Sequence, residues 1–259
     1  MEAMTTQLPT ETNATVYHRG GSGEALLYLH HIAGMQGWEP VHEELSQSFD
    51  VIAPYLPGAG PTADADEYRD AMDLVLHYRA LLDELGVARV HILGHSIGAW
   101  IGAEFAAVYP DRVKRMVLLN PMGAWEEELQ GEDPYAQAPM KATAVLLADP
   151  GRRDELILRN GEVDAQENYV QEMKDLKASA RFLWPVPDTG IMRRLPLVQS
   201  PTLVVTSKDD RVVPTGYGDL WAQQIPTSSA VTMEGGHLVN LEDPSGVATI
   251  AGNFFRGAE

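Results

Sequence analysis

Cysteine is absent from the 259 residues of the chain. Without a thiol, the chain forms no disulfide and offers no thiolate nucleophile, cysteine-bound metal or iron–sulfur cluster. Long apolar runs are missing as well, since no stretch approaches the roughly 18 apolar residues that a membrane-spanning helix needs. Met1–Thr15 has neither the basic start nor the apolar run of a signal peptide. We therefore expect a cytoplasmic protein that does not bind a membrane.

Basic residues are scarce. The chain has 19 Lys and Arg against 37 Asp and Glu, which gives a formal net charge of −18. A chain this acidic is repelled by the phosphates of nucleic acids, so we expect no nucleic-acid partner.

Signatures of bound metals and cofactors are also missing. The histidines at positions 18, 42, 77 and 91 have no spacing suited to a metal site. No glycine-rich dinucleotide fingerprint occurs either. We expect neither a metal nor an organic cofactor.

Short apolar runs alternate with helical patterns along most of the chain. The runs that predict buried strands are Ala25–Leu29, Val51–Pro54, Val90–Leu93, Val113–Leu119, Thr202–Thr206 and Ala230–Met233. The helical patterns are Trp38–Ser46, Arg69–Leu85, Ile97–Tyr109, Gly218–Gln224 and Val247–Phe255. This alternation predicts an α/β fold with a mainly parallel sheet flanked by helices on both faces. Tyr17-His18 and its neighbours predict an antiparallel edge strand.

One segment interrupts the alternation. From Pro121 to about Ser200 there is no strand of the same kind, and helical patterns cover Lys141–Leu147 and Arg152–Lys177. We predict that residues 121–200 form a helical cap inserted into a core built from residues 1–120 and 201–259.

A candidate nucleophile lies between a predicted strand and a predicted helix. Gly94-His95-Ser96-Ile97-Gly98 has the pattern Gly-x-Ser-x-Gly, and its strand–turn–helix context is the one that exposes a reactive serine at the edge of a sheet. Flanking glycines allow the close approach of neighbouring chain, and the turn holds the serine in a strained conformation. We predict that Ser96 is the nucleophile.

A serine needs a base and an orienting carboxylate, and this turn predicts the chain order serine, acid, histidine. His237 is the only histidine after Ser96. Asp209 and Asp210 both follow the predicted strand Thr202–Thr206, and we favour Asp210, with Asp209 ordering the turn. The end of the preceding strand is occupied by Asn120, which is not a carboxylate.

These segments together resemble the α/β-hydrolase superfamily, and the resemblance covers nearly the whole chain outside the predicted cap. Further segments that carry it are Leu29-His30-His31-Ile32, Leu56-Pro57-Gly58-Ala59-Gly60, Pro201-Thr202-Leu203-Val204-Val205 and Leu241-Glu242-Asp243-Pro244. The resemblance implies an oxyanion hole made by the backbone N–H groups of Ile32 and Ile97. His31 stands where the family usually has glycine, so it either narrows the pocket and binds a substrate oxygen or packs aside. His30 and His95 are expected to be neutral structural histidines.

The resemblance implies a serine hydrolase that cleaves small apolar carboxylic esters or lactones. Trp125 and Trp184 are candidates for the substrate pocket, together with His31. The alternative is carbon–carbon hydrolysis of ring-fission dienones, although Leu241 stands where such enzymes usually have tryptophan, and Arg193-Arg194 is expected to be an exposed pair. A hydrolase-fold binding protein or receptor also stays open, since such proteins can keep a complete triad.

Overall fold

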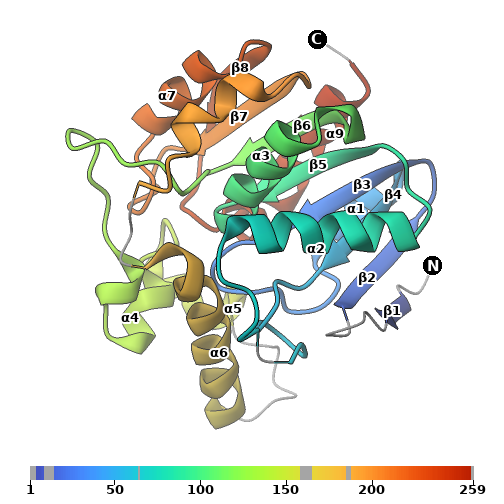
Figure 1. Ribbon diagram of the computed structural model, residues 1–259. Coiled ribbons are helices and arrows are strands. Elements are labelled where there is room, and N and C mark those ends of the chain that lie inside the picture. Colours follow the sequence, from blue (N-terminus) through green and yellow to red (C-terminus); the bar gives the residue numbers. More distant parts are fainter. Residues whose placement is uncertain (1–3, 9–14, 64, 158–164, 185–187, 258–259) are drawn as a thin grey trace.

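The computed structural model describes residues 4–8, 15–63, 65–157, 165–184 and 188–257 (Figure 1). Its centre is an eight-stranded sheet with the order β1-β2-β4-β3-β5-β6-β7-β8. In chain order the strands are β1 Met4–Leu8, β2 Thr15–Gly21, β3 Glu24–Leu29, β4 Phe49–Pro54, β5 Val90–His95, β6 Val113–Leu119, β7 Thr202–Ser207 and β8 Ser228–Met233. The six strands from β3 to β8 run parallel, which confirms the predicted fold class.

The antiparallel strand predicted around Tyr17-His18 is β2, which pairs with β4. It is not the edge strand, because β1 pairs antiparallel with its other side, with Met4 opposite Arg19. Thr5, Thr6 and Gln7 are polar, so backbone pairing builds β1 without a hydrophobic pattern that a sequence analysis would detect.

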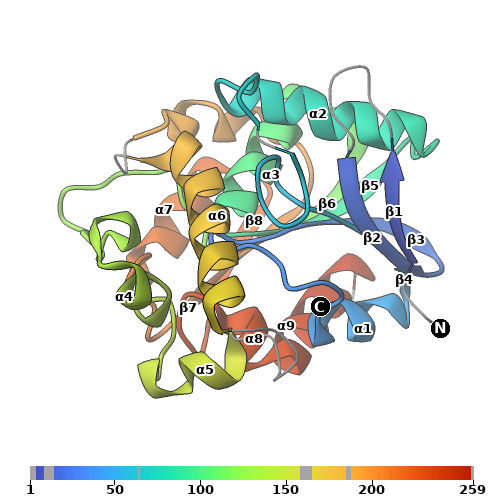
Figure 2. The same ribbon diagram turned by 90° about the horizontal axis from the view of Figure 1, so that it is seen from below.

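Helices cover both faces of the sheet, so apolar strands are buried on both sides (Figure 2). α2 (Ala71–Glu84), α3 (Ile97–Val108) and α7 (Gly216–Gln224) lie on one face, and α1 (Pro40–Ser46) and α9 (Pro244–Phe255) lie on the other. Local signals set the helix ends. For example, the Asp70 carboxylate accepts the Met72 N–H at 2.9 Å and so caps the start of α2.

Between β6 and β7 the described residues form helices and turns without a strand. α4 (Pro139–Ala144), α5 (Arg153–Leu156) and α6 (Ala165–Leu183) lie together at one end of the molecule (Figure 1). The helix predicted over Arg152–Lys177 is wrong at its end, since α6 continues to Leu183, shortly before Pro185. Residues 158–164 of that predicted helix, and the stretch 185–187, lie outside the described residues.

The short elements α8 (Val239–Glu242) and the 3₁₀ turn Pro134–Ala136 complete the surroundings of the site. In the part of the chain that the structure describes, every helix is too short or too polar to cross a membrane.

Candidate active site

The candidate nucleophile lies in a tight turn between β5 and α3. Ser96 has φ 59° and ψ −118°, a conformation that non-glycine residues rarely adopt. A Cβ atom on Gly98 would come within 2.1 Å of the Leu29 carbonyl oxygen, and one on Gly94 within 2.4 Å of the Gly98 carbonyl oxygen. Both glycines are therefore required by close backbone approach, and together they hold Ser96 at the N-terminus of α3.

The structure brings Ser96, His237 and Asp210 together, although they lie in three distant parts of the chain. His237 Nε2 is 2.7 Å from Ser96 Oγ, and His237 Nδ1 is 2.7 Å from Asp210 Oδ2. All three side chains are buried. With its proton on Nδ1 donated to the carboxylate, a neutral His237 accepts the Ser96 hydroxyl proton at Nε2.

The two neighbouring carboxylates differ sharply in environment. Asp210 is buried, and its Oδ1 accepts the backbone N–H groups of Val212 and Val213 at 2.8 and 2.9 Å. These bonds leave Oδ2 aimed at His237. Asp209 is exposed, and its backbone N–H donates to the Gly235 carbonyl oxygen at 2.9 Å, so it orders the turn through its main chain.

The backbone N–H groups expected to form the oxyanion hole belong to Ile32 and Ile97, whose side chains are fully buried. Ile97 is the first residue of α3, where N–H groups have no partner within the helix and the helix dipole favours negative charge. The Ile32 loop is fixed from α6, because Ser179 Oγ donates to the Ile32 carbonyl oxygen at 3.0 Å.

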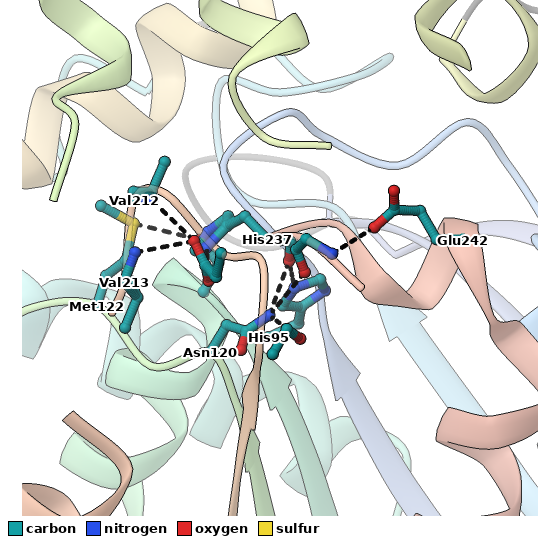
Figure 3. Close-up of polar contacts among 11 residues, drawn as sticks. His95, Asn120, Met122, Val212, Val213, His237 and Glu242 are labelled. Carbon is teal, nitrogen blue, oxygen red and sulfur yellow. Dashed lines mark hydrogen bonds and ion pairs between the residues drawn. The ribbon is translucent and has the colours of Figure 1, made fainter. Parts of the chain in front are cut away.

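Asn120 is a supporting residue whose role sequence analysis missed. It is fully buried with φ 45° at the end of β6, and its Nδ2 donates to the His237 carbonyl oxygen at 3.0 Å. His95 Nε2 donates to the same oxygen at 2.6 Å (Figure 3). Asn120, which the sequence analysis excluded as the acid, therefore fixes the backbone of His237, the candidate base.

The His237 loop is also tied to the inserted segment. Glu242 in α8 accepts the Gly236 N–H at 2.6 Å (Figure 3). It also accepts the Ala148 N–H at 2.9 Å. In addition, the Leu238 N–H donates to the Leu146 carbonyl oxygen at 2.9 Å. A carboxylate five residues after His237 thus joins the core to residues 146–148, a link that no local sequence pattern signals.

The neighbouring histidines are buried and neutral. Burial lowers the pKa of His30 to about 4, and its ring bridges the Leu56 N–H and the His31 carbonyl oxygen, each at 2.8 Å. Burial, together with the nearby His237, also lowers the pKa of His95. The His31 ring packs edge-on against His95, with 5.0 Å between ring centroids, and burial lowers its pKa too. The described side chains contain no group of three His, Asp or Glu that could hold a metal ion.

One cavity adjoins the site, and a second lies beneath α6. The smaller, about 230 Å³, is lined by Met122, Trp125 and Pro134, and Met122 Sδ lies 3.2 Å from Ser96 Oγ. The flexible, unbranched side chain of Met122 therefore lies between this cavity and Ser96. The larger cavity, about 630 Å³, is lined by Trp184 and Pro134. Pro134 lines both cavities. Both candidate tryptophans are about half exposed, and His31 lines neither cavity.

The expectation of an exposed Arg193-Arg194 pair is wrong for Arg194. Arg193 is exposed, but Arg194 Nε donates to Glu104 Oε2 at 2.6 Å, and this buried carboxylate also accepts the Trp100 indole N–H. A carboxylate in α3 needs a cation to offset the cost of burial, and the partner lies 90 residues away.

The buried carboxyl group of Glu39 leads us to expect that the stability of the protein depends on pH. Asn240, three residues after His237, donates its Nδ2–H to the Glu39 carboxylate at 3.2 Å. Burial raises the pKa of the Glu39 carboxyl to about 7. A raised acid pKa means that the folded state keeps a proton which the unfolded chain releases. This contribution to stability is full below about pH 4.5 and is lost as the pH rises to about 7.

Glu39→Gln should therefore remove part of the pH dependence of unfolding. Between pH 5 and pH 8, the wild type should lose about 3 kcal/mol of unfolding free energy relative to this variant, measured by urea denaturation. Glu43→Gln, an exposed position on the same helix, is the control and should track the wild type. Parallel pH profiles for Glu39→Gln and the wild type would contradict the assignment.

Comparison with known proteins places the chain in a family. The family model described as "Alpha/beta hydrolase family" matches residues 26–250. A 2-hydroxy-6-oxo-6-phenylhexa-2,4-dienoate hydrolase of Comamonas testosteroni is 27% identical over 229 residues, covering 78% of this chain and 77% of that protein. A second relative, from Pseudomonas savastanoi pv. phaseolicola, is named as a "Putative carbamate hydrolase". It is 26% identical over 227 residues, which cover 80% of this chain and 83% of that protein.

A solved structure shows the same fold along the whole chain. The serine hydrolase CCSP0084 from the bacterium Cycloclasticus zankles superimposes with a TM-score of 0.80 at 20% identity, covering 99% of both chains. Together with the sheet order and the family match over residues 26–250, this establishes that the chain is a member of the α/β-hydrolase family and a hydrolase.

Proposed function

We propose that the protein is a serine hydrolase that cleaves carboxylic esters or lactones through an acyl-enzyme, with residues 121–200 acting as the cap over the site. The observation that carries this is the unbroken hydrogen-bonded series from Asp210 through His237 to Ser96, with both contacts at 2.7 Å. Ser96 stands at a strained turn beside a helix N-terminus, where developing negative charge is stabilised.

The proposed mechanism assigns a role to each residue of the site. Ser96 Oγ attacks the carbonyl carbon while its proton passes to His237 Nε2, and Asp210 stabilises the charged imidazole. The backbone N–H groups of Ile32 and Ile97 hold the oxyanion, and His237 returns the proton to the departing alcohol. Water activated by His237 then releases the acid by the same steps in reverse.

Carbon–carbon hydrolysis of dienones is the second candidate, favoured by the name of the Comamonas testosteroni relative. That reaction expels a carbanion, so the substrate must first be tautomerised to a ketone and its carboxylate held. Arg193 and Arg194 offer no such grip, because Arg194 is bound to Glu104 and neither of the two lines the cavities described.

A substrate panel separates these reactions. We expect turnover of 4-nitrophenyl esters of short to medium acyl length, or of small lactones, and little cleavage of a ring-fission dienone. Multiple turnovers per enzyme molecule distinguish an enzyme from a binding protein, which would give one modification and stop. Efficient dienone cleavage with inert esters would overturn the ester proposal in favour of the second candidate.

A further inference from the structure

A short stretch of the predicted cap contacts the loops that carry Asp210 and His237. It covers residues 144–148, beginning at the last residue of α4, and we call it the linking segment. Residues 145–147 are buried and belong to the main apolar core. Because the linking segment is packed onto the core, it can hold other parts of the chain in place.

The chain just before His237 is bound to the linking segment through Glu242. This carboxylate accepts the Gly236 N–H with Oε2 at 2.6 Å and the Ala148 N–H with Oε1 at 2.9 Å. The two backbones also lie against each other, since a Cβ atom on Gly236 would come within 2.3 Å of the Ala148 nitrogen. A single side chain therefore bridges the histidine loop and the linking segment.

The loop of Asp210 is bound to the same segment through Arg211. The Arg211 guanidinium donates from Nη2 to the carbonyl oxygens of Ala144 and Leu147 at 3.2 and 3.1 Å. A basic side chain is favoured there, because Ala144 ends a helix. Arg211 lies between Asp210 and Val212, whose N–H holds the Asp210 carboxylate at 2.8 Å, so anchoring Arg211 fixes the turn that aims this carboxylate.

A further contact follows the histidine. The Leu238 N–H donates to the Leu146 carbonyl oxygen at 2.9 Å. The linking segment thus contacts the chain before His237, the chain after it, and the residue that follows Asp210. The two loops leave different strands, β7 and β8, so their relative position depends on what joins them.

An ion pair outside the linking segment also joins the two loops. Lys208 Nζ lies 3.1 Å from Glu234 Oε1, and the two side chains are 63% and 81% exposed. An ion pair this exposed contributes little. Neither side chain has a described hydrogen bond to residues 144–148, so this pair provides a control at the same two loops.

We propose that the linking segment positions His237 relative to Asp210, with Glu242 and Arg211 as the positioning residues that bind it to the two loops. His237 Nδ1 and Asp210 Oδ2 are 2.7 Å apart, and misplacing such a contact by about 1 Å costs on the order of 100-fold in rate. The proposal rests on the triad mechanism proposed above and adds that the predicted cap holds the triad in register.

Glu242→Ala and Arg211→Ala should each lower kcat by about 10- to 100-fold and leave KM nearly unchanged. Rates are measured on the best ester of the panel, per active site titrated with a fluorophosphonate. A residue that only stabilises the fold would lower the melting temperature and the number of active sites, and would leave kcat per site unchanged. Glu242→Gln keeps one acceptor oxygen and Arg211→Lys keeps a cation, so each should recover part of the loss.

The control variants are Lys208→Ala and Glu234→Ala, which should keep kcat within about two-fold of the wild type. The double variant of Glu242→Ala and Arg211→Ala should lose less than the product of the two single losses, because both act through one segment. A double loss equal to that product would contradict the shared role of residues 144–148.

The rate of fluorophosphonate labelling at Ser96 provides a readout that needs no ester. It should fall in both alanine variants and stay near the wild-type rate in the Lys208 and Glu234 controls. If labelling slows in this way but no ester is cleaved, the positioning role holds and the ester function is wrong. If esters are cleaved and Glu242→Ala and Arg211→Ala behave like the controls, the inference is wrong.

Discussion

Ser96→Ala should lower kcat by about 10⁶-fold, the scale reached when the nucleophile of a serine triad is removed. The alanine removes the only atom that forms the acyl bond, while His237 and Asp210 keep their mutual contact of 2.7 Å. The residual rate would come from the oxyanion donors and substrate positioning alone. The measurement is steady-state hydrolysis of the best ester found in the panel.

Stability must be followed alongside the rate, because Ser96 occupies a strained turn. Thermal unfolding should change little, since alanine and serine are similarly disfavoured at a φ of 59°. Ser228→Ala is the matched control. Ser228 lies at the start of β8, where its hydroxyl binds carbonyl oxygens of α7 and its C-cap, and its loss should leave kcat within a few-fold of wild type. A Ser96→Ala enzyme with undiminished activity would remove Ser96 from the mechanism.

Asp210→Asn should lower kcat by about 10⁴-fold, as neutralising a triad carboxylate does elsewhere. The amide still accepts the N–H groups of Val212 and Val213, so the loop keeps its conformation. Its NH₂ group, however, faces His237 Nδ1 and favours the tautomer with the proton on Nε2, which can no longer accept from Ser96.

Asp209→Asn provides the comparison one residue away. Asp209 is exposed and orders the turn through its backbone N–H, so this variant should retain nearly full activity. The opposite ranking of the two variants would reassign the acid to Asp209.

The sequence predicted most of what depends on local pattern. The six apolar runs became β3–β8. In β3–β7 the continuous Val, Ile and Leu suit parallel strands that are buried on both faces, whereas the edge strand β8 is partly exposed. The turn at Gly94–Gly98 was predictable for the same kind of reason, since its glycines are required by backbone contacts that the motif itself encodes. Asp210 is buried beside His237 and Asp209 is exposed, and the choice of Asp210 as the acid stays a prediction.

What could not be predicted depends on partners far apart in the chain. In the sequence, Asn120 shows only that no carboxylate follows β6. Its hydrogen bond to the His237 carbonyl oxygen joins residues 117 positions apart, so it becomes visible only in the folded structure. From the sequence alone we expect Arg194 to be a surface cation, because its partner Glu104 lies far away in the chain, in α3. β1 is held by backbone pairing, so its polar sequence gives no periodic signal.

Covalent labelling tests the central claim most directly. A fluorophosphonate reacts with a serine that is activated by a histidine base, and the adduct is stable enough to locate by peptide mass spectrometry. We expect one adduct per chain, on Ser96, with the reaction strongly slowed in Asp210→Asn and little changed in Asp209→Asn. An adduct on another residue, or an unmodified protein after long incubation, would contradict the assignment of Ser96 as the nucleophile.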